Sequence, residues 1–307
     1  MLGIHSALSP IRALPRIHLR LFHLAANLRN FILLNFVLIA AACSGESDPP
    51  GQAEDPSFSQ WALPHRLREI SGLALSSDER LFAVTDEEAV VYELDFQNGG
   101  IVKAFALGRP TLRGDFEGIA ILDNTFWLMT SDGELYATRE GSDGERVNYQ
   151  RHDTDLGDQC EFEGLAAIPV RNSLALICKQ ARKQKGLRIF EWTVAGAELQ
   201  KAAEIDLREK AMEKAIGRDR VNPSGLAYAE AADNWLVVAA KQNAIFELSR
   251  DGEEIDVIMR LDPGRHRQAE GIAVTSDGRL LVADEGGNGR ARLAVYQIED
   301  WEIKLID

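Results

Sequence analysis

Five short segments of the sequence repeat one pattern, in which an oxygen-bearing side chain stands directly before a glycine. The residues before the five glycines are Ser71, Glu117, Glu163, Ser224 and Glu270. If the fold brings these positions together, the carboxylates repel one another and their pKa values rise unless a cation joins them. Calcium suits such a set best, because it accepts about 6–8 oxygen ligands in tolerant geometry. We therefore expect a calcium site. The lack of Cys or His at these positions disfavours zinc.

A structural role for the glutamates is the alternative, in which they cap strand starts or pair with basic residues. Lys179 and Lys241 end predicted strands and are the candidate partners. Further oxygen-bearing residues stand two places before each of the five positions: Glu69, Asp115, Glu161, Asn222 and Gln268. A second tier of mixed acidic and basic residues ends the apolar second strands: Asp86, Glu87, Ser131, Asp132, Lys179, Lys241, Asp284 and Glu285. Such groups suit general acid–base work, although a solvated rim is the favoured interpretation.

The spacing of the repeats predicts the fold that would position these residues. The glycines follow one another at intervals of 46, 46, 61 and 46 residues: Gly72, Gly118, Gly164, Gly225 and Gly271. Each glycine is followed by turn residues and by apolar or alternating segments that predict short strands. Four strands in roughly 40–50 residues is the period of a β-propeller blade. The sequence therefore predicts an all-β, five-bladed propeller with four-stranded antiparallel blades, in which equivalent inner positions converge on one axis.

Closure of the ring and the long interval need separate explanations. The last repeat is too short for a fourth strand, and we expect residues 58–63 to complete its blade, with residues 301–306 as the competitor. The long interval holds a 15-residue insertion between blades 3 and 4. Asp206 and Glu209 resemble a capping box there, and apolar residues from Leu207 to Ile216 share one helical face. This pattern predicts a short helix.

The N-terminal segment has the features of an export signal. Residues 1–42 contain four arginines, no acidic residue and an apolar run at 31–42. This run is shorter than the roughly 20 residues that span a bilayer. Small residues then precede Cys43, as in the bacterial lipobox. We expect a lipoprotein signal peptide over residues 1–42, cleaved before a lipidated Cys43, with a plain signal peptide as the alternative. We expect residues 43–57 to form a flexible tether and residues 58–307 to form the propeller domain.

Two further cysteines, Cys160 and Cys178, form an even pair in an exported protein. They flank the predicted hairpin of blade 3, whose turn lies near residues 169–172. Their midpoint falls within about two residues of that turn, so they should face each other across neighbouring strands. We expect a disulfide between them. Two separate buried thiols are the alternative.

The charge distribution excludes one class of partner. The chain carries 34 basic and 48 acidic residues, and four of the basic ones lie in residues 1–42. The remaining chain is strongly acidic and cannot neutralise phosphates over an extended face, so no nucleic-acid partner is expected. We expect a monomer that meets the membrane through its lipid anchor. The sequence contains no G-x-S-x-G, P-loop or H-E-x-x-H motif. His65, His152 and His266 all lie in polar segments, which gives no support to a Ser-His-Asp triad.

Residues 66–298 resemble the SdiA-regulated family of bacterial β-propeller proteins. The resemblance rests on the order Ser, Glu, Glu, Ser, Glu before the repeat glycines and on the segment Phe82–Glu87. It implies a five-bladed propeller, often membrane-anchored, with calcium in the central site. It also implies a hydrolase role, through the likeness of the family to calcium-dependent lactonase and phytase-like propellers. Lys179 and Lys241 depart from the family pattern, as does the 15-residue insertion.

Two classes of function follow. The first is a calcium-dependent hydrolase of an ester, a lactone or a phosphoester, in which a carboxylate activates water. The second is a non-catalytic binding or scaffold lipoprotein, in which calcium is a structural ion. In either case we expect a lipid-anchored protein of the cell envelope that faces the periplasm, on the outer membrane if the host is Gram-negative. The fold alone does not choose between the two classes.

Overall fold

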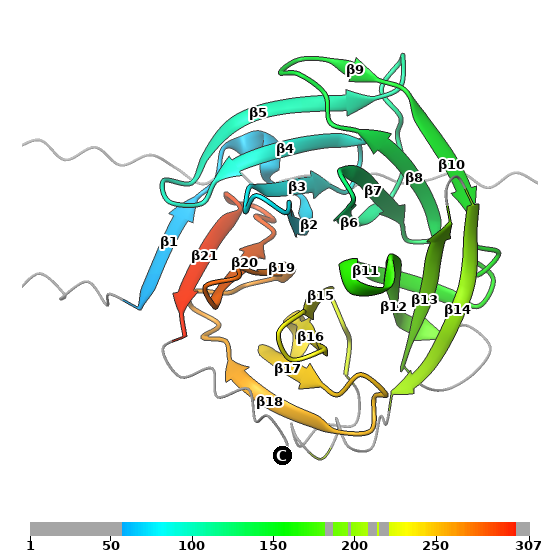
Figure 1. Cartoon of the computed structure of the whole chain (residues 1–307). Helices are drawn as coiled ribbons and strands as arrows, with labels where there is room; N and C mark the ends of the chain where they lie inside the picture. Colours follow the sequence, from blue (N-terminus) through cyan, green and yellow to red (C-terminus); the bar gives the residue numbers. More distant parts are fainter. Residues whose placement is uncertain (1–56, 182–186, 196–197, 208–213, 215–220, 299–307) are drawn as a thin grey trace, which may run out of the picture. The chain divides into compact units, whose positions relative to one another are not determined.

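The computed structural model describes residues 57–181, 187–195, 198–207, 214 and 221–298. These residues form five antiparallel sheets arranged around a common centre, with one strand of each sheet innermost (Figure 1). Each sheet corresponds to one sequence repeat. The predicted all-β, five-bladed propeller is therefore confirmed.

The first three blades run in chain order from their innermost strands outward. Blade 1 contains β2 (Ile70–Leu75), β3 (Leu81–Thr85), β4 (Val90–Asp95) and β5 (Gly100–Leu107), extended by the short parallel strand β9 (Arg146–Val147). Blade 2 contains β6 (Phe116–Leu122), β7 (Thr125–Thr130), β8 (Glu134–Arg139) and β10 (Tyr149–Asp153). Blade 3 contains β11 (Cys160–Ile168), β12 (Ser173–Ala181), β13 (Leu187–Ala195) and β14 (Glu198–Leu207).

The last two blades complete the ring. Blade 4 contains β15 (Gly225–Ala229), β16 (Asn234–Ala239), β17 (Ala244–Leu248) and β18 (Ile255–Arg260). Blade 5 contains β19 (Ala269–Val274), β20 (Arg279–Asp284), β21 (Arg292–Gln297) and β1 (Phe58–Ala62). In the part of the chain that the structure describes, three single-turn 3₁₀ segments lie among the strands: η1 (His65–Leu67), η2 (Pro169–Arg171) and η3 (Ala240–Gln242).

The N-terminal strand closes the ring. β1 pairs antiparallel with β21, so that Phe58 stands opposite Tyr296 and Ala62 opposite Arg292. The aromatic rings of Phe58 and Tyr296 lie 4.9 Å apart and add to the closure. The predicted closure of the last blade by residues 58–63 is therefore confirmed, with the strand ending at Ala62. The competing segment, residues 301–306, lies outside the described residues.

The core consists of five apolar clusters, one between each pair of neighbouring blades. The inner strands are apolar on both faces because both faces are covered by adjacent blades. The repeat glycines allow this close approach. A β-carbon on Gly164 would lie 2.6 Å from the backbone nitrogen of Leu226, and one on Gly225 would lie 2.3 Å from the carbonyl oxygen of Glu270. Real β-carbons do not come so close to a backbone atom, so only glycine fits at these two points.

Some predicted segments lie outside the described residues. These are the signal peptide, Cys43 and almost all of the tether. The predicted helical insertion also falls largely outside them, and its expected cap is wrong, because Asp206 and Leu207 are the last residues of β14. Among the residues that the structure describes, no helix is long and apolar enough to cross a membrane.

Candidate functional site

A repeated β-bulge positions the predicted site residues. In β6, Phe116 pairs with Thr130 and Gly118 with Met129, so Glu117 is the extra residue between two consecutive pairs. Ser71, Glu163 and Glu270 occupy the same bulged position in β2, β11 and β19. A bulge leaves one residue outside the ladder and redirects its side chain. Four of the five residues before the repeat glycines are thus turned by the same local feature, at the same place in each repeat.

The bulged residues from blades 1, 2 and 5 meet at one small cavity. Ser71, Glu117 and Glu270 line it together with the glycines of all five repeats. The cavity measures about 10 Å³, which is close to the minimum that holds one water molecule. It accommodates a single water or ion, and it is too small for an organic substrate.

Burial and mutual repulsion make these carboxyl groups weak acids. Burial, followed by the charges of Glu163, Asp115 and Glu270, raises the pKa of Glu117 to about 9. Burial and the charge of Glu163 raise the pKa of Glu270 to about 8. The mutual influence shows that the three glutamates share one electrostatic environment. Without a cation, Glu117 and Glu270 are predominantly protonated at neutral pH.

Glu163 differs from the other two glutamates because it has a basic partner. Its side chain is buried, and its carboxylate accepts a hydrogen bond from the Lys179 ammonium. Burial raises the pKa of Glu163, against the lowering effect of Lys179. Lys179 also lies 3.7 Å from the carboxylate of Glu161. The predicted alternative, pairing with a basic residue, therefore holds for Glu163 and Lys179. Lys241, the other candidate partner, is exposed in η3.

The two serines are bonded to backbone groups. The Ser71 hydroxyl donates to the carbonyl oxygen of Glu69 at 3.2 Å, which leaves its lone pairs accessible for the cavity. The Ser224 hydroxyl donates to the Ala269 carbonyl oxygen at 2.6 Å and accepts from the Ala240 backbone N–H at 3.1 Å. Ser224 does not line the cavity. Its hydroxyl holds blade 4 against blade 5, which is a structural role.

Second-tier residues make two separate hydrogen-bonded pairs. The Ser131 hydroxyl donates to Asp115 at 2.5 Å, and the Gln268 amide donates to Glu285. Burial and the charge of Glu69 raise the pKa of Asp86 to about 6. One oxygen of Asp86, Oδ1, is buried without a hydrogen-bond partner among the described residues. Asp86 is half-buried, so the solvated rim favoured from the sequence holds for it only in part.

The fit of this site to a metal is mixed. Ser71, Glu117 and Glu270 supply the hard oxygen donors that calcium prefers. However, nowhere in the described ranges do three or more acidic, His or Cys side chains stand in an arrangement that could hold a metal ion. The carboxylate of Glu163 is bound to the Lys179 ammonium and is therefore not available as a metal ligand. A cation therefore fits only after side chains of the ring reorient.

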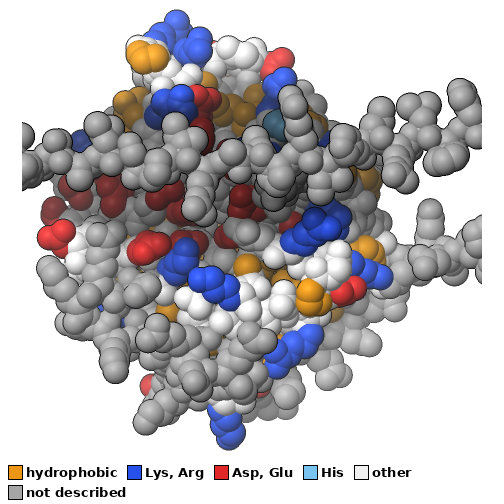
Figure 2. Space-filling view, turned by 180° about the vertical axis from the view of Figure 1, so that it is seen from behind, with side chains coloured by type: hydrophobic (Ala, Val, Ile, Leu, Met, Phe, Trp, Pro, Cys, Tyr) orange, Lys and Arg blue, Asp and Glu red, His pale blue; other side chains and the backbone are white. Residues whose placement is uncertain are grey.

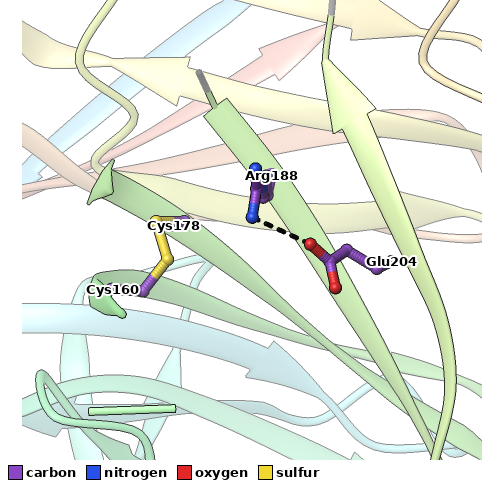
Figure 3. Close-up of a disulfide and its surroundings, with 4 residues drawn as sticks. All are labelled: Cys160, Cys178, Arg188 and Glu204. Carbon is purple, nitrogen blue, oxygen red and sulfur yellow. Dashed lines mark hydrogen bonds and ion pairs between the residues drawn. A yellow bond between two sulfur atoms is a disulfide. The ribbon is translucent and has the colours of Figure 1, made fainter. Parts of the chain in front are cut away.

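The disulfide lies beside this site. Cys160 and Cys178 are bonded within blade 3, with their Cα atoms 5.6 Å apart (Figure 3). Their positions relative to the turn predicted that the two cysteines stand directly opposite each other, but they do not. Cys178 pairs with Phe162, and Cys160 with Ala181, because the bulges near Glu161 and Glu163 shift the register. On the neighbouring strand, Arg188 stands opposite Cys178 and pairs with Glu204 at 2.9 Å. The cross-link therefore fixes the strand end that carries Lys179.

The sequence did not reveal a buried polar triad in blade 5. His266, expected in a polar segment, is only 1% exposed. Its Nδ1 lies 2.8 Å from Asp284, and its Nε2 lies 2.5 Å from the Tyr296 hydroxyl. Asp284 thus faces His266, not the channel rim where it was predicted. Tyr296 comes from β21, the strand that pairs with β1, so nothing in the sequence near His266 indicates this contact.

One face of the propeller is conspicuously acidic. Figure 2 shows Asp and Glu side chains gathered in a band across that face, with Lys and Arg side chains both above and below the band. A concentration of one charge sign attracts ions of the opposite sign. The acidic band itself therefore favours cations over anions.

Solved structures of enzymes with different activities share this fold. A luciferin-regenerating enzyme matches 79% of this chain and 96% of its own, with a TM-score of 0.51 and 10% identity. The glutaminyl cyclase of Myxococcus xanthus matches 78% of this chain and 96% of its own, with a TM-score of 0.51 and 14% identity. At such identities the likeness shows the fold alone. No curated protein matches the sequence.

The family model described as SdiA-regulated matches residues 60–285. This range begins in β1, which closes the ring, and ends just beyond β20 of blade 5. It contains all five repeat glycines and all five residues before them. By this match, which covers most of the propeller, the chain belongs to the SdiA-regulated family.

Proposed function

We propose that this protein is a lipid-anchored propeller of the cell envelope whose ring of glutamates binds a calcium ion, and that it hydrolyses an ester, a lactone or a phosphoester. The observation that carries the proposal is the convergence of Glu117, Glu163 and Glu270. Three separate bulges turn these side chains into one buried environment. Burying three mutually repelling carboxylates is costly, and a divalent cation offsets that cost.

Calcium suits this ring better than other divalent ions. The oxygen donors nearest the cavity are the carboxylates of Glu117 and Glu270 and the hydroxyl of Ser71. Magnesium demands a near-ideal octahedron and keeps several of its waters, for which a cavity of about 10 Å³ has no room. Calcium tolerates irregular oxygen cages and a variable ligand number. Glu163 would join the calcium ligands once the Lys179 ammonium releases its carboxylate. Ser224 would not bind the ion and would keep its hydrogen bond between blades 4 and 5.

The proposed hydrolysis needs a base, and Asp86, which directly follows β3 of blade 1, is the candidate that we propose. Its pKa of about 6 makes it a carboxylate at neutral pH that still accepts a proton readily. Its buried Oδ1 has no partner among the described residues and is available to orient a water. Bound calcium would polarise the scissile group. Substrate would lie on the face above the cavity, because the cavity itself holds only one small particle.

A non-catalytic binding lipoprotein is the second candidate function. The small volume of the cavity favours it, because an ion enclosed there has no open position for a substrate. In that case calcium would hold the inner strands of the five blades together. The face of the propeller would then serve a partner in the envelope.

Membrane attachment rests on Cys43. Lipidation there would hold the propeller near the membrane surface by the tether of residues 43–57. A Cys43→Ala protein should lose the acyl mass and move to the soluble periplasmic fraction. If the wild-type protein already lacks an acyl group and is soluble there, the anchor proposal is wrong.

Metal analysis followed by an activity screen decides between the two functions. The propeller is purified without chelator, its calcium content is measured, and chromogenic esters, lactones and phosphate esters are assayed with and without a calcium chelator. The hydrolase predicts bound calcium and turnover that the chelator abolishes and Asp86→Asn lowers by about 100-fold or more. Bound calcium without turnover of any substrate supports the binding lipoprotein. Absence of calcium from protein purified in its presence contradicts both.

A further inference from the structure

A second cleft is lined by residues of blades 2 and 3, which are neighbours in the ring (Figure 1). It measures about 570 Å³, within the range of about 300–1,000 Å³ that is typical of small-molecule sites. Glu117 is near the start of β6, whereas Leu122, at the end of that strand, lines this cleft. At roughly 3.3 Å per residue these two positions are about 17 Å apart. A ligand bound in the cleft would therefore be independent of the proposed calcium ion.

The cleft contains a buried indole whose N–H has no hydrogen-bond acceptor. Trp127 lines the cleft from β7 and is only 3% exposed, and its Nε1 has no partner among the described residues. The indole of Trp235 differs, because its Nε1–H donates to the Arg250 carbonyl oxygen at 3.2 Å. An indole N–H can only donate, and buried polar groups of proteins are normally paired. We therefore expect Trp127 to meet an acceptor that is not part of the described chain.

Two further ring nitrogens at the same interface lack a partner in the described part of the chain. His152 lines the cleft from β10, its ring centre lies 5.3 Å from that of Trp127, and its Nε2 is buried and unpaired. Burial lowers the pKa of His152, so the imidazole is neutral at neutral pH and can carry on Nε2 a proton that it donates. Trp192 packs against the apolar cluster that contains Trp127, and its buried Nε1 is also unpaired. Unpaired donors thus accumulate between blades 2 and 3.

The rest of the cleft is apolar or electrically balanced. Leu122, Ala137 and Val194 supply apolar surface. Arg139 and Asp123 are exposed and contribute one charge of each sign, and an Arg139 N–H donates to the Asp123 carbonyl oxygen at 3.2 Å. The lining therefore does not repel an anion, and it offers contacts to an apolar group as well as unpaired donors.

We propose that this cleft binds a small organic carboxylate with an apolar body. An ionised carboxylate only accepts hydrogen bonds, and its two oxygens can accept from several donors at once. Its bonds to the N–H groups of Trp127 and His152 would be charge-assisted, which makes them roughly twice as strong as neutral ones. The apolar body would pack on Leu122, Ala137 and Val194. A cationic ligand, in contrast, would leave the indole N–H groups unpaired.

The indole N–H signals in NMR spectra of the isotope-labelled propeller test this proposal. Phenylacetate, hexanoate and benzoate are each added at millimolar concentration, with a calcium chelator present. We expect the N–H signal of Trp127, assigned through Trp127→Phe, to shift downfield with at least one carboxylate. The signal of Trp235 should stay in place, because its N–H already has an acceptor. Phenylacetamide, hexanamide and benzamide have the same bodies without the charge and should bind at least about tenfold more weakly.

Two matched variants locate the binding. Trp127→Phe keeps an aromatic ring but removes the N–H, and it should weaken carboxylate binding by about tenfold or more. Trp61→Phe makes the same change against the cluster between blades 1 and 5 and should bind as the wild type does. The comparison of carboxylates with amides needs only the wild-type protein, so it decides the question even if Trp127→Phe does not fold. The proposal is overturned if no carboxylate moves the Trp127 signal, which would leave water as the partner of this N–H, or if carboxylates and amides bind equally. Preferential binding of hexylamine would equally overturn it.

Discussion

The ammonium of Lys179 donates a hydrogen bond to the buried carboxylate of Glu163. Burial lowers the pKa of Lys179, but the hydrogen bond and the charges of Glu163 and Glu161 outweigh this and raise it overall. The lysine therefore stays protonated and acts as a tethered monovalent cation inside a ring of carboxylates. Any calcium ion that uses Glu163 has to displace it.

Removal of this internal cation should strengthen calcium binding. In Lys179→Met the competing ammonium is gone, and calcium affinity should rise by about tenfold, while the calcium-free protein loses on the order of 1–3 kcal/mol because Glu163 has no partner. Lys241→Met is the matched control, since Lys241 is exposed outside the ring. Calorimetric titration of both variants measures the difference. Equal or weaker calcium binding by Lys179→Met would show that the lysine does not compete.

The stability of the calcium-free protein should fall as pH rises from about 5 to about 9. The folded-state pKa values of Glu117 and Glu270, about 9 and about 8, lie above that of an ordinary glutamate. The folded state therefore binds more protons than the unfolded state in this interval, and stability declines as these protons are lost. Chemical unfolding in chelator at several pH values measures the slope. Glu117→Gln should flatten it, and a wild-type slope of the opposite sign would refute this assignment.

Close packing at the axis predicts a steric effect at Gly225. In Gly225→Ala the new methyl group would meet the backbone oxygen of Glu270, and the clash should lower the free energy of unfolding by about 1–3 kcal/mol or more. Gly100→Ala is the matched control, because nothing lies within 4 Å of a β-carbon there. Denaturant unfolding measures both variants. A similar loss in the two proteins would rule out the packing explanation.

The disulfide should stabilise the strand that carries Lys179. It closes a loop with a sequence separation of 18 residues, and its loss in Cys160→Ala/Cys178→Ala should cost roughly 3 kcal/mol. Mass spectrometry of the wild-type protein should show a gain of two hydrogens on reduction, mapped to the two peptides. Labelling of both residues by a thiol reagent without prior reduction would mean that the bridge does not form in the cell.

The repeat pattern made the propeller and the convergence of the glutamates predictable from the sequence. A recurring residue at equal spacing must occupy an equivalent place in each blade, whatever the details of the strands. The bulges that turn Glu117 and Glu270 were not predictable, because one unpaired residue leaves no trace in the apolar pattern. The burial of His266 was hidden for a similar reason. Its neighbours in sequence are polar, and its partners Asp284 and Tyr296 come from other strands.

Lys179 illustrates why the site chemistry could be predicted only in part. The sequence identified Lys179 as a candidate partner of the glutamates but did not distinguish it from Lys241, which was predicted to end the equivalent strand of the next blade. The structure distinguishes them through the strand lengths. β12 continues as a strand through Lys179 to Ala181, whereas β16 ends at Ala239 and Lys241 lies in the 3₁₀ turn η3, where it is exposed.

The most direct test of the glutamate ring is a calcium titration by calorimetry at neutral pH. The wild-type propeller should bind about one calcium ion per chain, and its melting temperature should rise with calcium concentration, since a ligand bound only by the folded state stabilises it. Glu117→Gln/Glu270→Gln should lose at least about 100-fold in affinity, and Glu230→Gln/Glu254→Gln, two exposed glutamates, should bind as the wild type does. Absence of calcium binding by the wild type, or equal binding by the two double variants, would contradict the proposed site.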